Sequence, residues 1–160
     1  LPFGGTKSTG VGEREMAELR RRQFGFVFQA FNLFGSLTAQ ENVEVVLRMK
    51  GRPHDAVRRE AAVLLERVGL ARRAQAYPRD LSGGEKQRTA IARALAGDPP
   101  IILADEPPAN LDSRTGRDIL QLLRGQAQEL GKAVAIVSHD PKVEEVAHRI
   151  ISMEDGRLKS

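Results

Sequence analysis

The sequence predicts an α/β domain with an open, mostly parallel sheet and a helical subdomain inserted between two strands. Short apolar runs at residues 24–28, 101–104 and 133–137 predict buried strands, because each run is too brief for a helix and is bounded by polar or turn residues. The all-apolar run at 101–104 predicts a strand that is buried on both faces of the sheet. Helical periodicity fills the intervals between these runs. Strands that alternate with helices are typical of a parallel sheet.

The N-terminal part predicts one strand and its flanking segments. Residues 1–12 are rich in Gly, Ser and Thr and predict a loop, and residues 14–22 predict a short helix with Met16 and Leu19 on its inner side. The strand at 24–28 ends at Gln29. A loop then follows, with the apolar residues Phe31, Leu33 and Phe34.

Residues 38–97 are predicted to form the helical subdomain, and residues 1–37 and 98–160 a portion of the α/β core. Thr38, with Glu41 three residues later, predicts a capping box at the start of the first helix. The expected helices span residues 38–50 and 54–68, a short turn covers 71–76, and a further helix runs from Ser82 to Gly97.

The C-terminal part continues the alternation. A long amphipathic helix is expected over residues 113–130 and should be closed by Gly131. After the strand at 133–137 we expect a helix at 141–147 and a strand at 149–153. Asp155-Gly156 then predicts a hairpin turn into residues 157–158.

Composition limits the function classes. A chain of 160 residues with 41% hydrophobic and 29% charged residues is typical of one globular domain. The net charge is +4, but basic residues are scattered and aromatic residues make up only 4%, so nucleic-acid binding is not expected. The absence of cysteine excludes disulfides and thiolate metal sites. No apolar run reaches the length of a membrane span, so a cytoplasmic protein without direct membrane insertion is expected.

The stretch from Leu81 to Arg88 predicts an anion site at a helix N-terminus. Ser82 suits the N-cap position, and Glu85 suits the positive end of the helix dipole. Gly83 and Gly84 have no Cβ, so their amides can approach an anion such as phosphate closely. Ser-Gly-Gly alone would equally fit an ordinary capped helix.

Acidic and polar residues follow the predicted strands. Asp105 and Glu106 come directly after an apolar strand, where an α/β sheet binds its ligand. Asp105 could hold Mg²⁺ through water, and Glu106 could act as a general base on the water that attacks a γ-phosphate. Gln29 and His139 end two other strands, and Asp112 precedes a helix. Each alone would more often be structural.

Taken together and in order, these stretches resemble the motifs of the ABC-type ATPases, and the resemblance covers essentially the whole chain. It implies a P-loop NTPase core that binds ATP and Mg²⁺. Residues 81–88 would be the signature motif, with Ser82, Gly83, Gly84 and Glu85 toward the nucleotide. The remaining implied roles are Gln29 as the Q-loop glutamine near Mg²⁺ and water, Asp105 as the Walker B acid, Glu106 as the catalytic base, Asp112 as the D-loop aspartate and His139 as the switch histidine.

The resemblance also implies partners. In this family two ATPase subunits dimerise head to tail, and the signature turn of one completes the γ-phosphate site of the other. A membrane permease, which selects the cargo, would bind the subunit at the cytoplasmic face of the membrane through the Q-loop and the helical subdomain. Residues 26–33 and 37–43, with 153–158, look most like the exporter branch of lipoprotein-release, macrolide-efflux and DevA-like ATPases.

One family motif is not found. The stretch Gly5-Thr6-Lys7-Ser8-Thr9 has Thr6 where a P-loop needs its second glycine, and only 22 residues separate Lys7 from Gln29. We therefore expect the P-loop, the adenine-stacking loop and the first strands to lie upstream. By this expectation, the 160 residues alone hydrolyse ATP negligibly. Pro108, where the family usually has Thr, is a further departure, and it stiffens the entry to the D-loop.

Two other functions stay open from the sequence. A soluble ABC-type ATPase that acts in DNA repair or on ribosomes would share these motifs, although such proteins usually carry zinc modules, coiled coils or tandem domains. A non-catalytic regulatory subunit is the other alternative, and the intact Glu106 and His139 argue against it.

Overall fold

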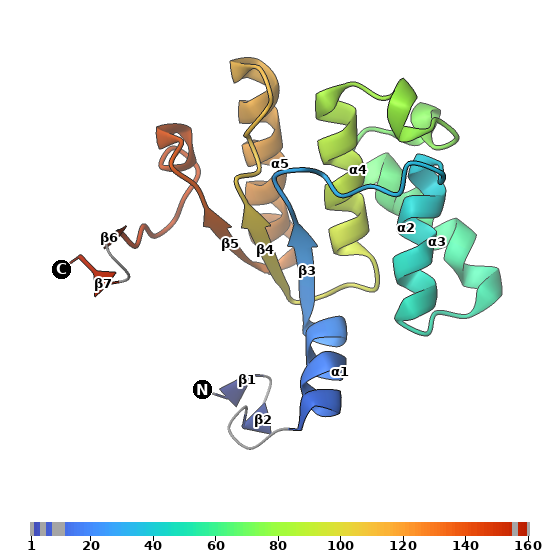
Figure 1. Ribbon diagram of the computed structural model, residues 1–160, viewed down its shortest axis with the longest axis horizontal. Helices are drawn as coiled ribbons and strands as arrows, with labels where there is room; N and C mark the ends of the chain where they lie inside the picture. The colour runs from blue at the N-terminus through green and yellow to red at the C-terminus, as the bar shows by residue number, and fades with distance from the viewer. Residues whose placement is uncertain (1, 4–5, 8–11, 155–156, 160) are drawn as a thin grey trace.

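A three-stranded parallel sheet forms the centre of the structure. The computed structural model describes residues 2–3, 6–7, 12–154 and 157–159. Strand β3 (Phe24–Val27) pairs with β4 (Ile101–Asp105), and β4 pairs with β5 (Ala133–Val137), so the order is β3-β4-β5. Figure 1 shows the helical block beside β3 and the C-terminal segment beyond β5.

The remaining elements are five α-helices, three short 3₁₀ turns and two small hairpins among the described residues. The helices are α1 (Glu13–Gln23), α2 (Ala39–Met49), α3 (His54–Arg67), α4 (Gly83–Leu95) and α5 (Ser113–Leu130), and the turns are η1 (Ala71–Arg73), η2 (Pro78–Asp80) and η3 (Pro141–Val143). In the hairpins, β1 (Pro2–Phe3) pairs with β2 (Thr6–Lys7), and β6 (Met153–Glu154) pairs with β7 (Arg157–Leu158).

The predicted helix start at Thr38 and helix end at Gly131 are confirmed, because the capping chemistry forms as expected. The Thr38 hydroxyl accepts a hydrogen bond from the Glu41 amide at 3.2 Å, and the Glu41 carboxylate accepts one from the Thr38 amide at 2.8 Å. Gly131 ends α5 with a φ of 62°, a left-handed conformation that glycine adopts without steric cost. Helix α4 ends at Leu95, two residues before the predicted stop at Gly97.

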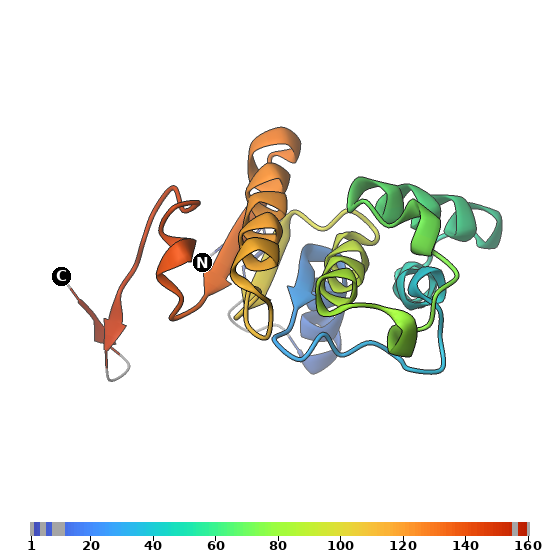
Figure 2. The same ribbon diagram turned by 90° about the horizontal axis from the view of Figure 1, so that it is seen from above.

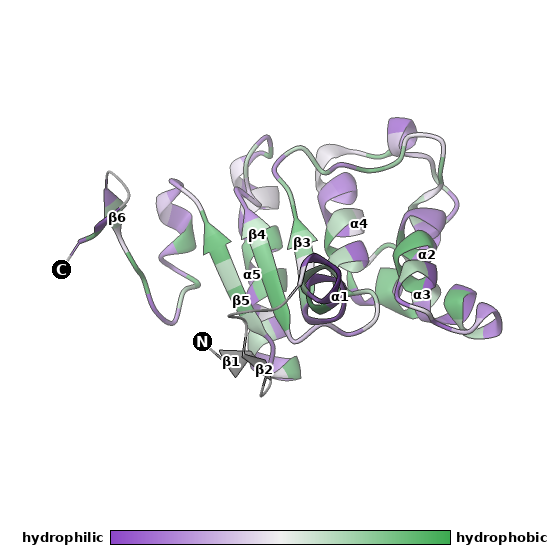
Figure 3. Cartoon of the chain, turned by 60° about the horizontal axis from the view of Figure 1, so that its bottom comes forward, coloured by the Kyte–Doolittle hydropathy of each residue, from purple (hydrophilic) through white to green (hydrophobic). Residues whose placement is uncertain are grey.

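Among the described residues the sheet is buried on one face only, so the prediction that the strand at 101–104 is buried on both faces was wrong. Val27, Ile102 and Ala104 are buried and belong to the core, whereas Phe26 is 38% and Val137 68% exposed. Alternate side chains point to opposite faces of a strand, and α4 and α5 cover only one of them. Figure 2 shows α5 on one side of the three strands, and Figure 3 shows the hydrophobic colouring along them.

One continuous core joins the helices to the covered face of the sheet. It includes Leu47 of α2, Leu65 of α3, Ile91 of α4 and Ile102 of β4, each fully buried. The boundaries of the helical subdomain at residues 38 and 97 stay a prediction. Among the described residues, no helix has both the length and the apolar character needed to cross a membrane.

Three other predictions differ from the structure. Only Pro141–Val143 of the helix expected at 141–147 is helical, and bonds between residues three apart continue the turn to Val146. Of the strand expected at 149–153, only Met153 is in a strand; because the segment lies away from β5, its backbone finds no ladder there. Within the expected loop at 1–12, four residues form the β1–β2 hairpin, and Lys7 lies in β2.

Two sequence predictions fall partly or wholly on residues that are not described. The stretch from Gly5 to Thr9, rejected as a P-loop, is described only at Thr6 and Lys7. The turn at Asp155-Gly156 lies outside the described residues, although β6 and β7 on either side of it pair antiparallel as a hairpin requires.

Gly25 provides a test of how closely α4 approaches the sheet. A Cβ at this position would lie 2.1 Å from the Ala94 carbonyl oxygen of α4. Gly25→Ala therefore forces α4 away from β3, and we expect it to lower the free energy of unfolding by about 1–3 kcal/mol. Urea denaturation measures this loss. Gly35→Ala is the matched control, because a Cβ there meets nothing within 4 Å; an equal loss in both variants would contradict the close approach.

Candidate nucleotide site

The predicted catalytic residues converge at the carboxyl ends of the three strands. Val27 lies beside Ala104, and Ala104 lies beside Ile136, so the residues that follow the three strands meet at one edge of the sheet (Figure 1). These are Gln29 after β3, Asp105 and Glu106 at the end of β4, and Ser138 and His139 after β5. The structure thus brings together residues that are 110 positions apart in the chain.

Glu106 is held by two residues that follow β5. One carboxylate oxygen, Oε2, accepts a hydrogen bond from the Ser138 hydroxyl at 2.6 Å. The other, Oε1, lies 3.1 Å from the His139 amide, which donates to it, and 2.6 Å from His139 Nδ1. Glu106 itself has a φ of 45°, which costs a non-glycine residue on the order of 1–3 kcal/mol and is typical of functional sites.

These hydrogen bonds keep Glu106 ionised. Desolvation by burial acts to raise its pKa, but the hydrogen bonds from Ser138 and His139 outweigh that effect, and the pKa of Glu106 lies below its ordinary value. The Glu106 side chain is only 17% exposed. At neutral pH Glu106 is therefore a carboxylate, and it accepts all three hydrogen bonds that Ser138 and His139 make to it.

His139 points its ring into solvent. Its side chain is 89% exposed, and because ionised Glu106 can only accept, Nδ1 carries the hydrogen in the contact to Oε1. Nε2 is then the ring nitrogen left for a ligand. Strand β5 ends at Val137, so His139 follows the strand by two residues, whereas the sequence predicted that it ends the strand.

Asp105 and Gln29 are exposed at the same edge. Neither side chain makes a hydrogen bond within the described part of the chain. One carboxylate and one amide oxygen suit Mg²⁺, which binds few protein oxygens and keeps several of its waters. Within the described ranges, no three His, Asp or Glu side chains gather closely enough to form an all-protein metal cage.

The signature turn opens α4 through a second capping box. The Ser82 hydroxyl accepts from the Glu85 amide at 3.3 Å, and the Glu85 carboxylate accepts from the Ser82 amide at 2.8 Å and from Arg73 Nε at 2.9 Å. Among the groups that lower the pKa of Glu85, the Ser82 amide makes the largest contribution. In the described structure the amides of Gly83 and Gly84 donate no hydrogen bond, so they remain available to an anion.

The two glycines also allow close packing, which sequence reasoning missed. A Cβ on Gly84 would lie 2.5 Å from the Thr115 methyl group at the start of α5, and one on Gly83 would lie 3.2 Å from Leu111. Behind the turn, fully buried Gln87 donates to the Pro107 carbonyl at 2.8 Å. The signature turn is therefore packed directly on the loop that follows Glu106.

Asp112 is the N-cap of α5. Its Oδ1 accepts from the amides of Arg114 and Thr115 at 3.1 and 3.0 Å, and the hydrogen bonds from Thr115 contribute most to lowering the pKa of Asp112. Pro108, the departure from the family pattern, packs against the same helix, because a Cβ on Gly116 would lie 3.3 Å from the Pro108 ring. The predicted contact of Asp112 with a second subunit stays a prediction.

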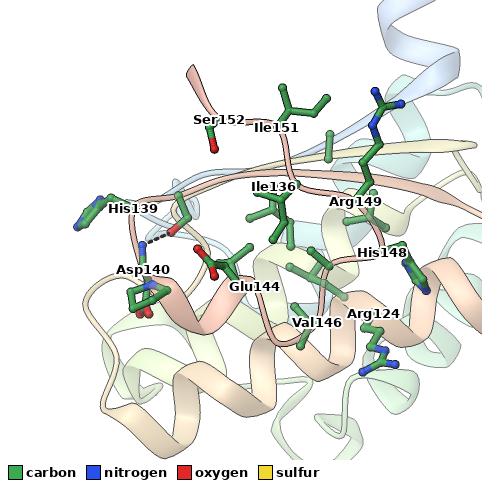
Figure 4. Close-up of a pocket in the computed structure, with 18 of the residues that line it drawn as sticks. Arg124, Ile136, His139, Asp140, Glu144, Val146, His148, Arg149, Ile151 and Ser152 are labelled. Carbon is green, nitrogen blue, oxygen red and sulfur yellow. Dashed lines mark hydrogen bonds between the residues drawn. The ribbon is translucent and has the colours of Figure 1, made fainter. Parts of the chain in front are cut away.

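A groove of about 700 Å³ borders the site on the β5 side. Figure 4 shows its wall running from His139 and Asp140, past Glu144 and Val146, to Arg149 and Ile151. Asp140 donates its amide to the Ser138 hydroxyl at 3.1 Å, so the same hydroxyl that contacts Glu106 is itself oriented by the groove wall.

Comparison with known proteins identifies a family. The family model described as "ABC transporter" matches residues 5–109. The macrolide export ATP-binding/permease protein MacB 1/2 of Paracoccus denitrificans is 47% identical over 154 residues, which cover 96% of this chain and 23% of that protein. The lipoprotein-releasing system ATP-binding protein LolD of Shewanella oneidensis is 42% identical over 149 residues, which cover 93% of this chain and 65% of that protein.

A solved structure agrees with the fold. The dimeric, post-hydrolysis state of the ATP-binding cassette MJ0796 bound to ADP and Pi superposes with a TM-score of 0.86 at 44% identity, covering 99% of this chain and 70% of that one. The chain thus spans between 23% and 70% of the length of these three proteins. The match of the fold and the shared order of motifs lead to one conclusion: this chain belongs to the ATP-binding proteins of ABC transporters.

Proposed function

We propose that the complete protein is the ATP-hydrolysing subunit of an ABC exporter. The observation that carries the proposal is the position of Glu106, an ionised carboxylate held by Ser138 and His139 beside the open carboxylate of Asp105. This arrangement suits hydrolysis of a phosphoanhydride, in which a positioned carboxylate orients the attacking water. The relatives named for macrolide export and lipoprotein release support the exporter branch.

The residues at the strand ends divide the work. Glu106 orients the attacking water and takes its proton, and His139 Nε2 contacts the γ-phosphate. Asp105 and Gln29 would hold Mg²⁺ through their oxygens and its waters. When bound, the ion neutralises the charge that develops on the phosphate oxygens. The free amides of Gly83 and Gly84, with Ser82, contact the γ-phosphate of a nucleotide bound by a second subunit.

The proposed partners are a second ATPase subunit and a membrane permease. The dimeric state of the MJ0796 cassette supports head-to-tail pairing, in which Asp112 contacts the opposing subunit. The loop after Gln29 supports a permease contact, because Phe34 is 53% exposed while Phe31 and Leu33 are half-buried. Through the permease the protein would lie at the cytoplasmic face of the membrane. The names of the relatives do not favour a soluble ATPase or a regulatory subunit.

Glu106→Gln tests the catalytic base. The amide keeps the size of the side chain but cannot take a proton from water, so we expect kcat of the complete protein to fall by about 10²–10⁴-fold with ATP binding retained. Phosphate release measures kcat, and equilibrium dialysis measures binding. Glu129→Gln is the control, because Glu129 is exposed on α5. Turnover that survives in Glu106→Gln would refute the assignment.

Ser138→Ala tests the support of the base through the pH dependence of the rate. The Ser138 hydroxyl lowers the pKa of Glu106, so its removal raises that pKa. Protonated Glu106 is inactive, and the acid limb of the kcat profile therefore moves to higher pH. Ser138→Thr keeps a hydroxyl and should retain the original limb, and Ser152→Ala, at an exposed serine, should leave it unchanged. An unmoved acid limb in Ser138→Ala would contradict this role.

A further inference from the structure

A buried guanidinium on α4 holds the backbone just after Gln29. Arg93 is only 9% exposed. Its Nη1 donates to the Asn32 carbonyl at 2.5 Å, and its Nη2 donates to the Phe31 carbonyl at 2.9 Å. The planar fork of arginine can bind two such acceptors at once, which the single ammonium of lysine cannot do in the same geometry. These hydrogen bonds join Arg93 to residues that lie 61 and 62 positions earlier in the sequence.

The two carbonyls belong to a strained turn. Phe31 and Asn32 have φ values of 60° and 49°, and left-handed backbone is costly for a bulky residue such as Phe31. Gln29 and Ala30 lie at the corner of this turn, which is closed by a hydrogen bond from the Phe31 amide to the Phe28 carbonyl at 3.1 Å. The strained conformation persists because hydrogen bonds from Arg93, outside the turn, hold the turn in place.

The charge of Arg93 is compensated by these carbonyls. In the described residues Arg93 makes no ion pair with a carboxylate. Burial lowers the pKa of the guanidinium, as expected for a desolvated cation. A buried charge without a paired carboxylate depends on its hydrogen bonds. The turn and the guanidinium therefore stabilise each other.

The other end of the same loop is anchored separately. Fully buried Asn42 of α2 accepts from the Phe34 amide at 2.8 Å and donates to the carbonyls of Phe34, Leu37 and Thr38. Two helices thus hold the two ends of the loop: α4 holds residues 31–32, and α2 holds residues 34–38. Gln29 lies next to the α4 anchor.

We propose that Arg93 is the positioning residue for Gln29. Arg93 attaches the turn that contains Gln29 to α4, and α4 is the helix that begins at the signature turn. A movement of α4 then moves Gln29 with it. The expected effect of this coupling on ATP hydrolysis rests on the proposed function. The mechanical link rests on the two hydrogen bonds and the strained turn.

Amide hydrogen exchange tests the link without using activity. In the complete protein we expect Arg93→Met to speed exchange of the Phe31 and Asn32 amides by about tenfold or more, because the turn loses its anchor. Arg88→Met is the matched control: Arg88 lies on the same helix and donates to the Val68 carbonyl at 3.1 Å, away from the turn. Equal exchange of the two amides in Arg93→Met and in the unchanged protein would overturn the proposal.

Steady-state ATP hydrolysis tests whether the link acts through Gln29. The variant is Arg93→Lys, which keeps the positive charge but can hydrogen-bond only one of the two carbonyls. It can also be used in place of Arg93→Met if that variant does not fold. We expect it to lower kcat by about tenfold to a hundredfold with KM for ATP changed little, because a displacement of about 1 Å can cost that much. Adding Arg93→Lys to Gln29→Ala should lower kcat no further.

The outcomes separate the two levels of the proposal. If the effects of Arg93→Lys and Gln29→Ala multiply, or if kcat of a folded Arg93→Lys is unchanged, Arg93 does not act through Gln29. If Gln29→Ala itself has no effect on kcat, the role assigned to Gln29 in the proposed function fails. The exchange of the Phe31 and Asn32 amides then still decides the link between Arg93 and the turn.

Discussion

The close approach of α4 to β3 is the contact on which the geometry of the site depends. The Ala94 carbonyl lies where a side chain on Gly25 would begin, so helix and strand meet almost backbone to backbone. From this fixed position α4 reaches two loops at the carboxyl edge of the sheet. Gln87 binds the Pro107 carbonyl after Glu106, and Arg93 binds the turn after Gln29. One helix thus sets the relative positions of the turn at Ser82, Glu106 and Gln29.

The electrostatics of the site follow from hydrogen bonding more than from burial. Glu106 is partly desolvated, which alone would favour its neutral form. The Ser138 hydroxyl, the His139 amide and His139 Nδ1 reverse that preference. An ionised Glu106 in turn selects the His139 tautomer with its hydrogen on Nδ1, which leaves Nε2 available to a ligand. The ionised state of Glu106 and the His139 tautomer are therefore linked through a single short contact.

Local chemistry made much of the fold predictable. The capping box at Thr38, the N-cap at Ser82 and the helix end at Gly131 require only residues within one turn, and all three form as predicted. The three strands of the sheet were also predicted, because short apolar runs between helices have few alternatives. The strand at 149–153 failed, because an apolar run becomes a strand only where another strand offers it a ladder. Burial on both faces failed for a similar reason, since it depends on which helices cover the sheet.

The sequence by itself determined the family, the order of the motifs and the residue types at each strand end. These are properties of neighbouring residues, which spacing and side-chain chemistry reveal. Only the tertiary structure decided that Ser138 supports Glu106, that Gly84 must be small because Thr115 lies against it, and that Arg93 holds the turn after Gln29. Each of these contacts joins residues that are 31 to 62 positions apart, and nothing in the local sequence specifies such a partner. The packing of α4 and α5 against the sheet brings them within reach.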